Sequence, residues 1–241
     1  MQLRGTSALI TGASRGLGAA LARELAAAGV RVALVARTQT DLDRVVAELR
    51  AAGGDAHGVV GDVADKFAVH GIAATAAAVV GPIDLLVHNA GTLGPTPLRA
   101  LLDTDCEDLE RALDVNVVGP FRLSKIVAGS MALRGHGTIA HVTSDAAVEA
   151  YPTWGAYAIS KAALEHLGRS LAVELQDTGV RIWNVDPGEM DTQMHRDALP
   201  DADPATLSRP ADIARRFVRL LAEPQRWPSG ARIDLLRAEA A

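Results

Sequence analysis

Residues 7–18, Ser7-Ala8-Leu9-Ile10-Thr11-Gly12-Ala13-Ser14-Arg15-Gly16-Leu17-Gly18, decide the fold of this chain. The run SALIT at 7–11 is short and mostly apolar, as in a buried strand, and LGAALARELAAAG at 17–29 has apolar residues at helical spacing. The glycines between them permit a tight turn and let backbone approach a ligand, while a helix N-terminus offers N–H groups to an anion. The stretch predicts a strand, a phosphate-binding loop and a helix; the alternative is a glycine-rich turn without a ligand.

The rest of the chain repeats this alternation of short apolar runs and amphipathic segments. Further strand-like runs occupy residues 30–36, 57–62, 83–89, 137–144, 180–186 and 231–236, and helix-like segments occupy 40–53, 65–80, 105–133, 154–177 and 210–222. Strands that are apolar throughout and separated by helices indicate a parallel sheet covered on both faces. We therefore predict one doubly wound, Rossmann-type α/β domain over residues 1–241, with about seven parallel strands.

Helix ends and one long loop add detail to this prediction. Glycines that favour a left-handed conformation follow three helical stretches, at Gly29, Gly53 and Gly179, and Thr40 and Asp62 are candidate N-caps. Residues 188–209 form a long connection after the sixth strand, at the sheet edge where open α/β sheets bind ligands. We expect this loop to be mobile and to close over a site shared by a cofactor half, about 1–145, and a catalytic half, about 146–241.

Composition excludes several classes of protein. The 241 residues include 24 Lys plus Arg and 29 Asp plus Glu, a net charge of −5, with 49% hydrophobic and 22% charged residues. These values are typical of a globular protein and disfavour nucleic acid as a partner. The sequence shows no signal peptide, no bilayer-spanning apolar run and no metal-binding His or Cys spacing, and Cys106 is the single cysteine. We expect a cytoplasmic protein with neither membrane attachment nor metal.

Tyr157 and Lys161 form the main candidate catalytic pair. They are four residues apart in a helical segment, so their side chains share one face. A nearby ammonium group stabilises a phenolate and lowers the pKa of a tyrosine from about 10. Ser144 ends the fifth predicted strand, beside the same crevice. The alternative is chance: a strand-terminal serine in a turn, a surface lysine, and an asparagine, Asn116, that kinks a helix.

Seven motifs occur in a familiar order. They are TGASRGLG at 11–18, Asp62-Val63, HNAG at 88–91, Asn116, Ser144, Tyr157-x-x-x-Lys161 and PGEMDT at 187–192. With this spacing the chain resembles the classical short-chain dehydrogenase/reductase family from end to end. It departs from the family pattern at His88, where Asn is common, and in its C-terminal ending, ARIDLLRAEAA.

The resemblance implies a role for each catalytic candidate. Ser144 would orient the substrate oxygen, and Tyr157 would transfer a proton. Lys161 would hold the nicotinamide ribose and lower the pKa of Tyr157, while Asn116 would hold a water that links the lysine to solvent. Trp154, which closely precedes Tyr157 in the sequence, is a candidate for the pocket lining, the core or a subunit interface.

The resemblance also implies a cofactor site. Its candidate residues are Gly12, Ser14, Arg15, Gly16, Leu17, Gly18, Arg37, Thr38, Asp62, Val63, Asn89, Ala90, Gly91, Tyr157, Lys161, Pro187, Gly188 and Thr192. Some of these have simpler alternative roles. Asp62 could contact adenine or only cap a helix, Asn89-Ala90-Gly91 could be a turn, and Pro187-Gly188 could be an ordinary loop start.

Arg37 indicates which nicotinamide cofactor binds. Enzymes of this architecture that use NAD place an acidic residue at the end of the second strand to hold the ribose hydroxyls. That strand here ends Val35-Ala36-Arg37-Thr38. A 2′-phosphate suits a planar, multi-donor guanidinium, and Arg15 with Ser14 and Thr38 could complete the site. We therefore predict NADP(H); the alternative is that Arg37 is a solvated strand-end residue.

These observations predict an NADP(H)-dependent oxidoreductase acting on a small-molecule ketone, aldehyde or secondary alcohol. A non-catalytic NADP(H)-binding sensor or regulator of the same fold is the alternative, and a lyase or epimerase that keeps its cofactor is a third possibility. The resemblance also implies a homodimer or homotetramer that associates through the long helices at about 105–133 and 154–177.

The cofactor prediction can be tested by reversing one charge. Arg37→Asp should weaken NADPH binding at least tenfold more than NADH binding, because only NADPH carries the 2′-phosphate that the guanidinium would bind. Titration of each cofactor against both proteins, followed by fluorescence, measures the two changes. An equal loss for both cofactors would contradict the assignment.

Overall fold

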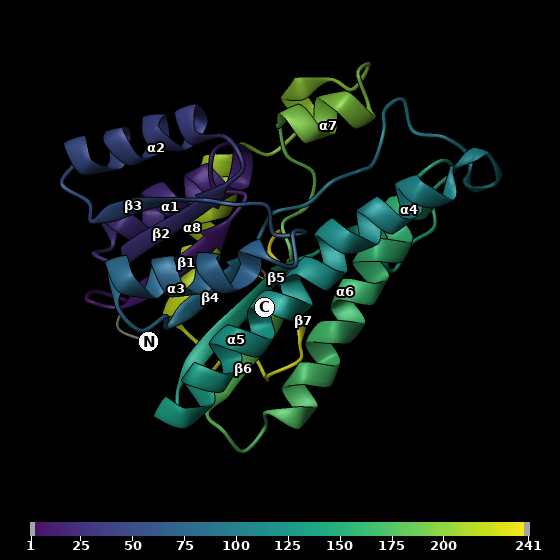
Figure 1. Ribbon diagram of the computed structural model, residues 1–241. Helices are drawn as coiled ribbons and strands as arrows, with labels where there is room; N and C mark the ends of the chain where they lie inside the picture. The colour runs from purple at the N-terminus through teal and green to yellow at the C-terminus, as the bar shows by residue number, and fades with distance from the viewer. Residues whose placement is uncertain (1–2, 239–241) are drawn as a thin grey trace.

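A seven-stranded sheet runs through the centre of the computed structural model, which describes residues 3–238 (Figure 1). The strands are β1 Ser7–Thr11, β2 Arg31–Ala36, β3 Ala56–Val60, β4 Leu85–His88, β5 Gly137–Val142, β6 Val180–Asp186 and β7 Arg232–Asp234. Their order is β3-β2-β1-β4-β5-β6-β7 and every pair is parallel. The order reverses between β1 and β4, so the predicted doubly wound α/β fold is confirmed.

Helices cover both faces of this sheet (Figure 1). They are α1 Gly16–Ala27, α2 Gln39–Ala51, α3 Ala68–Val80, α4 Cys106–Leu113, α5 Gly119–Arg134, α6 Gly155–Glu174, α7 Gln193–Ala198 and α8 Pro210–Ala222, with a π-helix, Asp114–Val118, between α4 and α5. The core residues of α1, α2 and α8 pack on one face, and those of α3, α5 and α6 pack on the other.

The two cores follow from the alternation of side chains along each strand. Ile10 of β1 joins the core under α1, whereas its neighbour Leu9 joins the core under α3, and neither is exposed. Leu9 is in register with Ala33 of β2 and Leu86 of β4. Burial on both faces explains why these strands read as continuous apolar runs.

The glycine predictions are confirmed, whereas both N-cap predictions are wrong. Gly29, Gly53 and Gly179 have φ angles of 82°, 83° and 75° after the ends of helices or turns. Helix α2 begins at Gln39, which places Thr40 inside it. Helix α3 begins only at Ala68, and the Asp62 carboxylate accepts a hydrogen bond from Ala64 N–H at 3.0 Å in a local turn. Such turns compete with helix starts for Asp side chains.

The long connection at residues 188–209 contains its own structure. It holds α7 and a 3₁₀ turn, Pro204–Thr206, and its two ends are joined by a bridge between Met190 and Ser208. We call residues 188–209 the lid. Within residues 3–238, no helix has both the length and the hydrophobicity to cross a membrane.

Two histidines are stacked in the interior, on neighbouring strands. The rings of His88 and His141 lie 5.1 Å apart; His88 Nε2 is 2.8 Å from Ser124 Oγ, and His141 Nδ1 is 3.3 Å from Asn184 Oδ1. Burial lowers the pKa of His88 well below 6.5 and that of His141 to about 4, and the His141 ring lowers the His88 pKa further. Both rings are therefore neutral in the folded protein.

This pair should make folding sensitive to mild acid. Between about pH 6.5 and 4, these histidines bind protons in the unfolded chain but remain neutral in the folded chain. The free energy of unfolding should therefore fall as pH falls, by about 3 kcal/mol from His141 alone. Denaturant unfolding at pH 8, 6 and 4.5 measures this slope. His88→Asn should flatten it, whereas His70→Asn, an exposed control on α3, should not. Equal slopes for wild type and His88→Asn would contradict the account.

Candidate active site

The loop between β1 and α1 comes so close to the loop after β4 that only glycine fits. A Cβ on Gly12, whose φ is 66°, would lie 2.7 Å from the Cα of Ala90. A Cβ on Gly18 would lie 2.4 Å from the carbonyl oxygen of Gly12. Real Cβ atoms do not make such contacts, so these glycines are required for the two loops to pack.

Hydrogen bonds hold the two loops in this position. Asn89 Nδ2 donates to the carbonyl oxygens of Thr11 and Gly12 at 3.0 Å each, and the backbone N–H groups of Asn89 and Ala90 donate to Thr11 Oγ1 at 3.1 Å. The Asn89 side chain thus fixes the shape of the glycine loop. The sequence HNAG at 88–91 is more than an ordinary turn, although its cofactor contact stays a prediction.

The start of α1 offers an anion site. Arg15 occupies the N-cap position and no side chain caps the first N–H groups of this 12-residue helix. Arg15 and Arg37 are exposed and line one cavity, and among residues 3–238 neither forms an ion pair. Asp62 differs, because it pairs with Arg111 at 2.9 Å. Burial opposes ionisation of Asp62, but the Ala64 N–H and Arg111 outweigh it and hold its pKa below the ordinary value.

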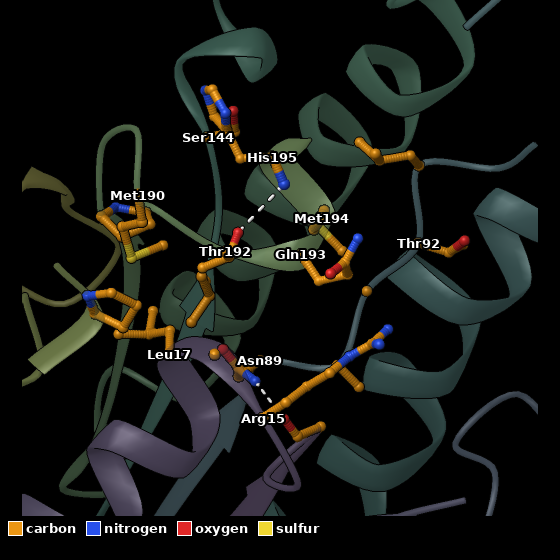
Figure 2. Close-up of a pocket in the computed structure, with 18 of the residues that line it drawn as sticks. Arg15, Leu17, Asn89, Thr92, Ser144, Met190, Thr192, Gln193, Met194 and His195 are labelled. Carbon is orange, nitrogen blue, oxygen red and sulfur yellow. Dashed lines mark hydrogen bonds between the residues drawn. The ribbon is translucent and has the colours of Figure 1, made fainter. Parts of the chain in front are cut away.

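This cavity, of about 790 Å³, continues from the glycine loop to Ser144 and Tyr157. Figure 2 shows Arg15 and Asn89 around the same space as Ser144 and residues of the lid. All predicted site residues line it except three, namely Gly18, Thr38 and Asn116. Gly18 lies beneath the loop, Thr38 precedes α2, and Asn116 is completely buried.

The catalytic candidates come together from three elements. Ser144 follows β5 and its Oγ accepts from Ala146 N–H, while Tyr157 and Lys161 lie on α6, both more than nine-tenths buried. Lys161 Nζ donates to the carbonyl oxygen of Val142 at 2.8 Å and lies 5.5 Å from the centre of the Tyr157 ring. The Ser144 hydroxyl lies close enough to Tyr157 to lower the pKa of its phenol.

Asn116 lies in the interior, behind the residues that line the cavity. It lies in the π-helix, where its Oδ1 accepts from Thr92 N–H and its Nδ2 donates to Thr92 O, both at 2.9 Å, and also to Ser160 Oγ at 2.8 Å. The side chain joins the loop after β4 to α6. Both amide hydrogens are used in this way, and the water-holding role of Asn116 stays a prediction.

The pKa of Tyr157 differs from the expectation drawn from its lysine neighbour. Burial raises this pKa above 10, the Ser144 hydroxyl lowers it in part, and the carboxylates of Asp186 and Asp145 raise it further. Lys161 faces the ring instead of the hydroxyl, which explains why its charge does not offset the burial. In this geometry Tyr157 is therefore a protonated acid at neutral pH.

Burial also acts on Lys161. It lowers the pKa of the ammonium group to about 8, against the opposing influence of Asp186 and Glu165. Without those two carboxylates the lysine would lose its charge more easily, because a buried ammonium group is poorly solvated. The acidic pair therefore helps to keep a cation beside Tyr157 at neutral pH.

One guanidinium holds the acidic pair in place. Arg232 of β7 donates through Nε to Glu165 Oε1 at 2.9 Å, and through Nη2 to Asp186 Oδ2 at 2.7 Å and to the carbonyl oxygen of Ser144 at 3.1 Å. The two carboxylate side chains are 2% and 7% exposed. Arg232 thus connects β7 to α6, to the end of β6 and to Ser144, which follows β5. An unpaired buried charge here would cost about 3–5 kcal/mol.

The lid covers this end of the cavity. Thr192 Oγ1 accepts from His195 N–H and so caps α7 (Figure 2). The Thr192 methyl group lies 3.6 Å from the position of a Cβ on Gly16. Met194 packs against the small apolar cluster that includes Tyr157 and Trp154. Trp154 also lines the cavity, with its ring 5.8 Å from that of Tyr157. The lid and α6 together form the apolar wall of the site.

Sequence reasoning missed Arg232, Glu165, Asp186 and Asp145. Asp186 ends β6 and Asp145 follows Ser144. The rule that drew attention to Ser144, a polar residue at the carboxyl end of a strand, applies to both aspartates. The partnership of Arg232 with Glu165 spans 67 residues, and no local pattern reveals it. Among residues 3–238, no cluster of His, Cys, Asp and Glu could hold a metal ion.

Comparison with known proteins gives the family of this chain. Residues 6–203 match the sequence profile described as short chain dehydrogenase. The 7α-hydroxysteroid dehydrogenase of Escherichia coli K12 is 32% identical over 239 residues, which cover 95% of this chain and 92% of that protein. A short chain dehydrogenase of Pseudocercospora fijiensis is 38% identical over 80% of this chain, but the match spans only 62% of that longer protein. The chain belongs to the short-chain dehydrogenase/reductase family.

Solved structures agree in fold. A 7α-hydroxysteroid dehydrogenase complexed with NADH and 7-oxo glycochenodeoxycholic acid has a TM-score of 0.88 and 31% identity, covering 97% of this chain and 94% of that one. A short chain dehydrogenase from Shigella flexneri complexed with NADP has a TM-score of 0.90 and 26% identity, covering 98% of each chain. The protein is an NAD(P)(H)-dependent oxidoreductase acting on alcohol or carbonyl groups.

Proposed function

We propose that this protein is an NADPH-dependent reductase of ketones or aldehydes, and that it oxidises the matching secondary alcohols in reverse. The observation that carries the proposal is the arrangement of one cavity. Two guanidinium groups that form no ion pair within residues 3–238, Arg15 and Arg37, line it together with Tyr157 and Ser144. The same cavity can therefore bind the phosphates of a cofactor at one end and transfer a proton to a substrate at the other.

The residues present fit a nicotinamide dinucleotide. The glycine loop leaves no room for side chains beside the uncapped start of α1, which suits a pyrophosphate. Arg15, Arg37, Ser14 and Thr38 would hold a 2′-phosphate, since guanidinium groups bind phosphate in a bidentate manner. Asp62 and Val63 would face the adenine, and Pro187, Gly188 and Thr192 the nicotinamide. When bound, NADPH supplies a hydride to the carbonyl carbon.

Tyr157 and Ser144 act on the substrate oxygen. Ser144 would donate a hydrogen bond to this oxygen as negative charge develops on it. Tyr157, protonated at neutral pH because burial raises its pKa, would give its proton to the same oxygen as general acid. In alcohol oxidation Tyr157 would take the proton back. For that direction its pKa must fall. The Ser144 hydroxyl already lowers it, and the Lys161 cation would lower it further if Nζ moved from above the ring toward the hydroxyl.

Lys161 and Asn116 support this proton transfer. Lys161 would hold the ribose hydroxyls through Nζ, which lies above the Tyr157 ring. Asn116 would hold a water that connects the lysine to solvent. We also propose a cytoplasmic homodimer or homotetramer built on α5 and α6. Both helices carry exposed apolar residues, including Leu133 and Val173, as a subunit interface requires.

Tyr157→Phe tests the proposal directly. The variant should oxidise NADPH with a ketone or aldehyde at least 100-fold more slowly than wild type, because general acid catalysis contributes about 10²–10⁴-fold. NADPH binding should change little, since the phenyl ring remains. Absorbance of NADPH follows turnover across a panel of ketones, aldehydes and a 3-oxoacyl thioester. The matched control is Tyr151→Phe, which removes the only other phenol hydroxyl of the chain and should cost less than tenfold.

Three results would contradict the proposal. Wild-type activity in Tyr157→Phe would exclude the tyrosine as the acid. Tight NADPH binding without oxidation of NADPH by any member of the panel would instead favour a non-catalytic NADPH-binding protein. Product formation without net NADPH oxidation would indicate a lyase or epimerase.

A further inference from the structure

Asp145 directly follows Ser144, and its exposed carboxylate lines the substrate end of the cavity. Its Oδ1 accepts from Ser144 Oγ and from Ala146 N–H, both at 2.8 Å, and its Oδ2 accepts from the Tyr151 hydroxyl at 2.8 Å. An ionised carboxylate has about four acceptor positions, so one position on Oδ2 remains for a ligand.

This carboxylate lies close to the reacting centre. The Ser144 hydroxyl has one hydrogen, which it donates to Asp145 Oδ1. When this hydroxyl turns to donate to a substrate oxygen instead, that oxygen and Asp145 Oδ1 each lie about one hydrogen-bond length from Ser144 Oγ. The substrate oxygen and the carboxylate are therefore within about 5–6 Å of each other. A substituent on the carbon next to the carbonyl carbon can bridge that distance.

The surroundings of Asp145 are negative. The hydrogen bond that Asp145 accepts from the Tyr151 hydroxyl raises the pKa of Tyr151, and burial and the charges of Asp145, Glu149 and Glu189 raise it further. Among residues 3–238, Asp145 has no ion-pair partner, and Glu189 has only His195, at 3.7 Å.

The buried cations nearby are already balanced. Arg232 pairs with Glu165 and Asp186. The same two carboxylates lie near the Lys161 ammonium group and raise its pKa. Glu165 also pairs with Arg169 at 3.4 Å, so both buried carboxylates have cationic partners, whereas within residues 3–238 no Lys, Arg or His lies within ion-pair distance of Asp145.

An aromatic ring completes the environment. Trp154 lines the same cavity and stands edge-on to Tyr157 at 5.8 Å. Tryptophan is the aromatic residue that binds cations best through its ring face. The unpaired guanidinium groups, Arg15 and Arg37, lie toward the glycine loop, where they would repel a second cation. A positive ligand group is thus favoured beside Asp145 and disfavoured at the glycine-loop end of the cavity.

We propose that Asp145 is a specificity-determining residue that selects substrates with an ammonium group on the carbon next to the reacting carbon. The substrates would be α-amino ketones or aldehydes and their amino alcohols. This inference rests on the proposed oxidoreductase function, and it adds the substrate class.

Paired substrates of matched shape test the proposal. The probes are 2-amino-1-phenylethanol, 1-phenyl-1,2-ethanediol and 1-phenylethanol, each oxidised with NADP⁺ at a pH where the amine is protonated. Wild type should show a kcat/KM for the amino alcohol at least tenfold above that for either neutral alcohol. Added salt should reduce this ratio, because screening weakens exposed charge pairs. The diol has a neutral hydroxyl group in place of the ammonium group, so it shows how much of the preference comes from hydrogen bonding without charge.

Variants at Asp145 identify the group responsible. Asp145→Asn keeps the shape but removes the charge, and should bring the ratio to within about threefold of one. Any general loss through Ser144 affects all three alcohols and cancels in the ratio. Asp145→Glu should keep part of the preference. Asp177→Asn, an exposed control with the same change in net charge, should keep all of it.

Binding to the protein loaded with NADP⁺, measured by calorimetry, is the second readout and does not require turnover. Tighter binding of the amino alcohol than of the diol, lost in Asp145→Asn, would support the proposal even if none of the three alcohols reacts. Turnover of the neutral alcohols with no ammonium preference would overturn the proposal and leave the oxidoreductase function intact. A preference that survives in Asp145→Asn, an equal preference for the diol, or no difference in binding would also overturn it.

Discussion

All seven strands run in one direction, and this constraint places every group of the site. The loops after β1, β2, β4, β5 and β6 leave from the same edge of the sheet, where the order reverses between β1 and β4. The glycine loop, Arg37, Asn89 and Ser144 therefore meet although they are far apart in the sequence. Helix α6 packs beside this edge and adds Tyr157 and Lys161. A single sheet edge thus brings the residues proposed to bind the cofactor phosphates beside the proposed proton donor.

Buried charge gives the site its chemistry. Burial raises the pKa of Tyr157, which keeps the phenol protonated, and lowers the pKa of the Lys161 ammonium group. Nearby carboxylates, Asp186 among them, also act on both pKa values. Arg232 balances Glu165 and Asp186 while it also holds the carbonyl oxygen of Ser144. Water has little access to these ion pairs, because the Glu165 and Asp186 side chains are almost completely buried. Position and protonation of the catalytic candidates are therefore set by the same contacts.

Much of the fold could be predicted from periodicity and glycine placement, since fully buried strands and helix ends leave local signals. The caps could not, because Asp62 satisfies a turn in preference to a helix start and Thr40 lies inside α2. The glycine loop, Ser144 and the Tyr157 pair carry short-range spacing that can be read directly. The pKa of Tyr157 and the contacts of Arg232 depend on burial and on pairs distant in sequence, so they require coordinates.

The proposed function requires this cavity to transfer a hydride from NADPH to a carbonyl carbon. The decisive experiment uses NADPH carrying deuterium at both nicotinamide C4 positions, with the product of each ketone or aldehyde analysed by mass spectrometry. One deuterium is expected on the carbinol carbon for each NADPH oxidised. NADPH that binds but delivers no deuterium to any carbonyl compound, or product formed without the label, would contradict it.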